Sequence, residues 1–179
     1  MRRIDFNQIE AQEDGTYNAP SPGGYIARIE RVEDNEQKEY LVIEWDFAEG
    51  PFAGYNAETE ERAGFWPTCL FRSYKEKALP FFKGFLTAVE RSNRRFVFDC
   101  ARPNCLEGKL VGVVLGEEEY RKRNGKTGTR LYVARTCSID TIEDGKYTVP
   151  ECKRLQADTQ AASAPALAEL DGDDGELPF

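Results

Sequence analysis

Positive and aromatic side chains alternate in the segment 120–135, on both sides of an Asn124-Gly125 pair. Cations neutralise phosphates, and flat rings stack on bases whatever the nucleotide sequence. We therefore expect this segment to contact single-stranded DNA. Its candidate contact residues are the rings Tyr120 and Tyr132 and the cations Arg121, Lys122, Arg123, Lys126, Arg130 and Arg135. The alternative is a solvated hairpin whose arginines pair with the three glutamates at 117–119.

A second group of rings and cations lies between positions 65 and 75. Pro67 disturbs the alternation that would assign these rings to the core or to the surface, so both assignments stay open. We expect four members of the group to line a DNA-binding groove: Trp66, Arg72, Tyr74 and Lys75. Packing in the core is the alternative for the rings, among which Phe65 and Phe71 are also found.

The last nine residues, 171–179, are acidic and end in an aromatic residue. A partner protein can take the terminal ring into an apolar pocket and pair the α-carboxylate with Arg or Lys. The residues expected to bind such a partner are Asp173, Asp174, Glu176, Leu177, Pro178 and Phe179. This tip resembles the C-terminal peptide of bacterial single-stranded DNA-binding proteins, and the resemblance implies docking of replication and repair enzymes.

Residue types that serve catalysis are scarce. The chain has no His, which removes the usual general base near neutral pH. Its five cysteines form no CxxC pair, so we expect free thiols and no metal site. We also expect no cofactor. Glu44 and Asp46 alternate on an expected strand, where two carboxylates could hold the metal of a nuclease, but no further ligand completes that site. We read them as exposed strand carboxylates and expect a protein that is not an enzyme.

Negative charge is concentrated at the C-terminus. The net charge is −8, and the segment 156–179 holds six acidic and no basic residues, which leaves −2 for residues 1–155. Since charges act over a Debye length of about 8 Å, a local basic groove is compatible with this balance. The sequence shows neither a secretory signal nor a membrane-spanning apolar run, so we expect a cytoplasmic location in a bacterial host cell.

The segments that must position these residues alternate as strands do. We expect a mainly β fold with strands at 25–32, 39–47, 64–72, 109–115 and 130–137. Trp45 shares a face with Leu41, Ile43 and Phe47, which indicates a core position. Between the third and fourth strands, Pro80 and the spacing of Phe82, Phe85 and Leu86 predict a helix. Three strands, a helix and two strands is the order of an OB-fold, a five-stranded barrel that commonly binds oligonucleotides.

The composition changes after Leu155. Residues 156–167 are mostly small and polar and cannot bury enough surface to offset their ordering entropy, so we expect a disordered acidic tail. The expected organisation is an N-terminal extension (1–22), an OB-fold DNA-binding domain (23–155) and a tail (156–179) whose tip binds a partner.

Short segments between residues 20 and 155 resemble a family of small single-stranded DNA-binding proteins from phages and prophages of Gram-positive bacteria. The resemblance is carried by 24–25, 40–41, 73–85, 108–112, 116–120 and 129–133. It implies a role in phage DNA replication or recombination. We therefore expect a protein that coats single-stranded DNA without sequence preference, with homo-oligomers possible, and recruits enzymes through its tip. The alternative is an interaction module that inhibits a host replication or repair enzyme without binding DNA.

Overall fold

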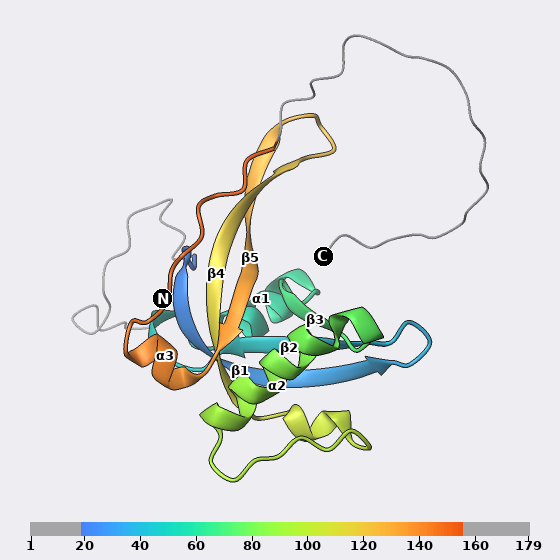
Figure 1. Ribbon diagram of the computed structural model, residues 1–179. Coiled ribbons are helices and arrows are strands. Elements are labelled where there is room, and N and C mark those ends of the chain that lie inside the picture. Colours follow the sequence, from blue (N-terminus) through green and yellow to red (C-terminus); the bar gives the residue numbers. More distant parts are fainter. Residues whose placement is uncertain (1–18, 156–179) are drawn as a thin grey trace, which may run out of the picture.

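The computed structural model describes residues 19–155, which form a mainly β structure around one antiparallel sheet (Figure 1). Its strands, in the spatial order β3-β2-β1-β4-β5, are β1 (Gly23–Asn35), β2 (Tyr40–Phe47), β3 (Cys69–Ser73), β4 (Leu110–Arg121) and β5 (Thr127–Cys137). The helices are α1 (Tyr55–Ala63), α2 (Leu79–Ser92) and α3 (Ile139–Glu143), with 3-10 turns at Gly50–Phe52, Glu76–Ala78 and Pro103–Leu106.

The core lies on one face of the sheet, because side chains alternate across each strand. In β2, the alternate residues Leu41, Ile43, Trp45 and Phe47 are all buried, which confirms the expected core position of Trp45. The β4 residues Val111, Val113 and Leu115 join them from across the sheet. Each fully buried large side chain stabilises the fold by roughly 1.5–3 kcal/mol.

The helix expected between the third and fourth strands is α2. Its core side carries Phe85, Ala88 and Val89, which are buried, while Phe82 and Leu86 pack partly against the core. Asn93 ends the helix: its side-chain amide donates to the carbonyls of Val89 and Leu110 at 2.7 Å. This residue therefore ties the end of α2 to the start of β4.

Several expectations about the elements were wrong. The third strand begins at Cys69, not at 64, because Pro67 interrupts the segment before it. The helices α1 and α3 were not expected. The sequence of α1 has no apolar stripe, so periodicity gives no signal for it, and only Asn56 and Thr59 of this helix are buried.

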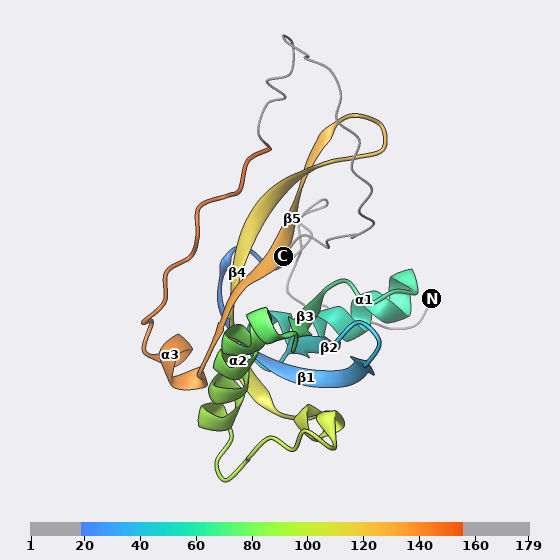
Figure 2. The same cartoon turned by 45° about the vertical axis from the view of Figure 1, so that its right-hand side comes forward.

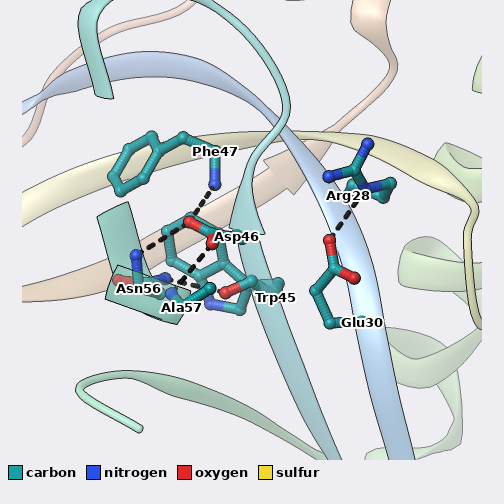
Figure 3. A network of polar contacts seen from close by, with 7 residues as sticks. All are labelled: Arg28, Glu30, Trp45, Asp46, Phe47, Asn56 and Ala57. Atoms are coloured by element: carbon teal, nitrogen blue, oxygen red, sulfur yellow. Dashed lines mark hydrogen bonds and ion pairs between the residues drawn. The ribbon is translucent and has the colours of Figure 1, made fainter. Parts of the chain in front are cut away.

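A buried carboxylate holds α1 in place (Figure 3). Asp46 accepts hydrogen bonds from the backbone amides of Phe47, Asn56 and Ala57 at 2.8–3.0 Å, and Asn56 donates to the carbonyl of Trp45 at 2.7 Å. Asp46 thus satisfies amides in the first turn of α1, which have no partner within the helix. The expectation that Asp46 is an exposed strand carboxylate was wrong, since it is buried against this helix.

The sheet is open. Among the described residues no ladder joins β3 to β5, so the expected closed barrel is not formed. The two edge strands meet through side chains instead, with the Arg72 guanidinium donating to the Thr136 hydroxyl at 3.5 Å. Helix α2 contacts both edge strands and β4.

The β4–β5 hairpin extends past the rest of the sheet as an arm, here defined as residues 116–132 (Figure 1). A strap, residues 138–155, starts at α3 and runs back along the hairpin (Figures 1 and 2). It packs on glycines: a Cβ at Gly24, Gly112 or Gly116 would lie within 2.5–2.7 Å of Tyr147, Ile142 or Pro150. Strand β1 pairs with β4 only as far as Leu115. Beyond that point Lys153 forms a parallel bridge with Glu118, so the strap covers the free edge of β4.

None of the helices described between residues 19 and 155 has the length and apolar character needed to cross a bilayer. Two of the expected segments, the acidic tail 156–179 and most of the N-terminal extension, lie outside the described residues.

Candidate nucleic-acid interface

The arm owes its tight turn to the Asn124-Gly125 pair that the sequence singled out. Gly125 has φ +77°, a left-handed conformation that favours glycine, and the amide of Lys122 donates to the carbonyl of Lys126 at 2.8 Å. The strands then pair continuously from Arg121 and Thr127 back to Gly116 and Tyr132. The hairpin is therefore a regular two-stranded scaffold that presents its side chains on two faces.

Two tyrosines lie on the face of the arm that faces away from the core, and each has a cation over its ring. The Lys153 ammonium lies 3.9 Å from the centroid of the Tyr132 ring, and the Arg130 guanidinium lies 5.6 Å from that of Tyr120. Tyr132 is directly opposite Gly116, which leaves room for its ring. Rings and cations are the groups that contact the bases and phosphates of a single strand.

The tip of the arm is exposed and cationic. Arg121, Lys122, Arg123 and Lys126 are all exposed. Within residues 19–155, no carboxylate lies within 4.0 Å of the charged nitrogens of Arg123 and Lys126. These two cations are therefore available to an external anion.

The pairing of hairpin arginines with glutamates is realised in part. Glu118 pairs with Arg130 at 2.7 Å, whereas the Glu119 carboxylate accepts the backbone amide of Leu155 at 3.0 Å. Arg135 is exposed further along β5. Arg130 is more than half exposed in its pair, so this contact is weak in water.

The residues expected between 65 and 75 do not form one surface. Arg72 lies on the core side, where its guanidinium is 5.3 Å from the Phe85 ring centroid and burial lowers its pKa. Tyr74 donates to Asp34 at 2.9 Å, and burial together with this bond raises its pKa to about 12. Lys75 is exposed after β3. The structure thus separates Arg72 and Tyr74 from the arm.

Trp66 belongs to a cluster on the outer side of β1 and β2. The Arg31 guanidinium lies 5.0 Å from the Trp66 ring centroid and pairs with Glu60 at 2.7 Å and with Glu44. These carboxylates, Glu60 first, raise the pKa of Arg31. A cavity of about 300 Å³ opens between Arg28, Arg31 and Trp66, but Arg28 is itself paired with Glu30 (Figure 3). The cations of this cluster are already neutralised.

Two further residues, Tyr40 and Lys153, contact rings of the candidate segments although the sequence did not indicate them as contacts. Tyr40 meets the edge of the exposed Phe71 ring at 5.9 Å on the outer side of β2 and β3, and Lys153 reaches Tyr132 from the strap. Strand alternation in β2 placed Tyr40 on the face opposite the core, but nothing in the sequence pairs Lys153 with Tyr132.

Within the described part of the chain, no cluster of three or more acidic, Cys or His side chains is arranged to hold a metal ion. The expected partner-binding tip, 171–179, lies outside the described residues. No protein-family model matches the chain, and no curated protein matches it.

Proposed function

We propose that this protein binds single-stranded DNA through the arm and acts in the cytoplasm, without catalysis, in phage DNA replication or recombination. The observation that carries the proposal is the row of rings and cations on the arm, with Arg123 and Lys126 exposed at its tip. Rings stack on bases and cations attract phosphates without reading sequence, so the expected activity is non-specific coating of the strand.

The topology supports an incomplete OB-fold. The strand order β3-β2-β1-β4-β5, with a helix between β3 and β4, is that of an OB-fold whose closing β3–β5 pair is missing. OB-folds bind oligonucleotides on the outer face of strands two and three. Phe71 is 59% exposed on that face here, with Tyr40 beside it. These rings would extend the contact made by the arm.

The tail has a separate role in this proposal. The acidic segment 156–179 would recruit replication or recombination enzymes through its Leu177-Pro178-Phe179 end. The described chain ends at Leu155, whose amide is held by Glu119 of the arm. The tail would therefore start beside bound DNA, which favours delivery of an enzyme to the coated strand.

The proposal is tested by fluorescence anisotropy of a labelled oligo(dT). Trp45 is buried and Trp66 is beside Arg31, so a label on the DNA is a better reporter than tryptophan emission. Each phosphate contact contributes about fivefold in affinity at ~0.1 M salt, so Arg123→Glu with Lys126→Glu should weaken binding by at least ~25-fold.

Lys38→Glu is the matched control for Lys126→Glu. Both lysines are exposed in hairpin turns, but Lys38 lies in an acidic turn that includes Glu36 and Glu39, whose negative charge opposes contact with phosphates. Equal effects of the two substitutions, or no binding by the unmodified protein at low salt, would contradict the proposal. The second result would favour the interaction module that does not bind DNA.

A further inference from the structure

Helix α2 carries a cationic surface that is separate from the arm. The segment 75–95 contains six basic and two acidic residues. Of the two acids, Glu90 is engaged: its carboxylate accepts the backbone amide of Phe98 at 3.1 Å. In the described chain no carboxylate lies within 4.0 Å of the charged nitrogens of Lys77 or Arg91, and both are exposed. Their charge is available to an external polyanion.

An aromatic ring stands out among these cations. Phe81 is 80% exposed, although Phe85, one helical turn later, is 1% exposed in the core. In the first turn of α2, Phe82 thus packs partly against the core while Phe81 faces solvent. Phe81 is not part of the core cluster and leaves most of its ring in solvent.

Gly84 lies three residues after Phe81, so the two are neighbours on the helix surface. A glycine inside a helix destabilises it relative to alanine. A Cβ at Gly84 would meet nothing within 4 Å, so packing within the described chain does not require glycine there. A close approach by an external backbone does require it, because any side chain would keep that backbone away from the helix.

We propose that this surface of α2 is a second contact site for the same single-stranded DNA, with Phe81 stacking on a base and Lys77 and Arg91 contacting phosphates. The proposal rests on the proposed function and extends it. A protruding ring suits stacking on a flat base, whereas an apolar peptide anchor needs a hollow to enter. The sugar-phosphate backbone would pass over Gly84.

The experiment compares labelled oligo(dT) of about 8 nucleotides, within the range that one OB-fold covers, with one of about 30 nucleotides. Arm variants should weaken binding of both. Substitutions on α2 should weaken binding of the longer oligonucleotide only, since the shorter one is held by the arm. Phe81→Ala should cost about 5- to 150-fold in affinity for the longer DNA, the effect of losing one stacked base.

Gly84→Gln separates binding from folding. Glutamine favours the helix, so Tm should rise by ~2–4 °C, while affinity for the longer oligonucleotide falls. Lys77→Glu should also lower this affinity, and Lys38→Glu, the same charge change at an exposed lysine elsewhere, should not.

The outcomes distinguish the two proposals. If the unmodified protein binds neither oligonucleotide, the proposed function fails. If it binds both and the α2 variants bind the longer DNA as the unmodified protein does, only the second site is overturned. A labelled peptide of residues 171–179 is titrated in parallel. If the α2 variants lose that peptide and keep DNA, the surface is a site for an acidic peptide and the inference is wrong.

Discussion

Two regions on the outer side of the sheet combine arginines with aromatic rings, and they differ in what neutralises the charge. In the β1–β2 region, Arg31 pairs with Glu44 and Glu60 and lies over Trp66. On the arm, Arg130 has one carboxylate partner, while Arg123 and Lys126 at the tip are exposed without one among the described residues. The cations of the first region are neutralised within the fold, whereas these two cations at the tip of the arm are not paired within the described residues.

The comparison shows that a count of cations and rings does not identify a binding surface. Both regions look alike by that count, and Trp66 was expected to contact DNA for that reason. The position of the acidic side chains separates them, because a paired arginine gains little from a phosphate and loses its existing partner. Substitutions in the β1–β2 region should therefore change stability, and substitutions on the arm should change affinity.

The largest expected effect is on stability. Asp46→Ala removes the buried acceptor of three backbone amides and should lower the free energy of unfolding by about 3 kcal/mol, with a fall in Tm of ~6–12 °C. Urea denaturation measures this loss. Asp46→Asn keeps one acceptor oxygen and should lose less.

Affinity of folded Asp46→Ala for oligo(dT) should match that of the unmodified protein. A loss of binding as large as the loss of stability would contradict the division between the two regions, since it would place DNA contacts at α1.

The next largest effects are expected from removing one aromatic ring in each region. Tyr132→Leu removes a stacking ring but keeps apolar bulk over Gly116, and should lower affinity for oligo(dT) by about 1–3 kcal/mol with little change in Tm. Trp66→Leu should do the reverse, lowering Tm and sparing affinity, because the Arg31 guanidinium over its ring is already paired with Glu44 and Glu60. The proposed difference between the two regions is wrong if both substitutions lower Tm alone or both lower affinity alone.

Substitution of single arginines should give smaller effects, on stability in the β1–β2 region and on DNA affinity in the arm. Arg31→Gln removes solvent-exposed ion pairs and should lower stability by at most about 1 kcal/mol without changing affinity. Arg123→Gln should leave stability unchanged and lower affinity about fivefold at ~0.1 M salt. Anisotropy titrations measure the affinity of both variants for oligo(dT), and urea titrations measure their stability. A fivefold loss of affinity in Arg31→Gln would refute the predicted difference between the two arginines.

The smallest expected effect is a pH dependence of stability caused by Tyr74. Burial and the bond to Asp34 raise its pKa to about 12, above the ordinary value of 10. As pH rises, the phenol of Tyr74 therefore ionises first in the unfolded chain. Its contribution to the free energy of unfolding is complete below pH 10 and is lost as pH rises from 10 to 12. Tyr74→Phe should flatten the fall of the urea midpoint in this window. An identical fall in the variant would mean that other groups cause it.

The sequence predicted elements whose patterning is strong. Alternation in 39–47 identified β2 and its buried side, and the Asn124-Gly125 pair identified the hairpin turn. The apolar face around Phe85 identified α2. Helix α1 was missed because it is held by Asp46, a contact ten residues away that local periodicity does not encode.

The candidate site was predicted in its composition and not in its arrangement. The arm residues were found because they lie close together in sequence. Lys153 was missed because a parallel bridge to Glu118 brings it to Tyr132 across many residues. Arg72 was placed among the contacts because Pro67 hid its register, and the pairing of β2 with β3 puts it opposite Leu41 on the core side.

The most direct test of the account is the salt dependence of oligo(dT) binding. If Arg123 and Lys126 contact phosphates, the logarithm of the association constant should fall linearly with the logarithm of the salt concentration. The slope should be shallower by ~1.4 in a variant with Arg123→Gln and Lys126→Gln, about 0.7 for each lost contact. The same slope in both proteins would contradict the claim that the exposed cations of the arm hold the DNA backbone.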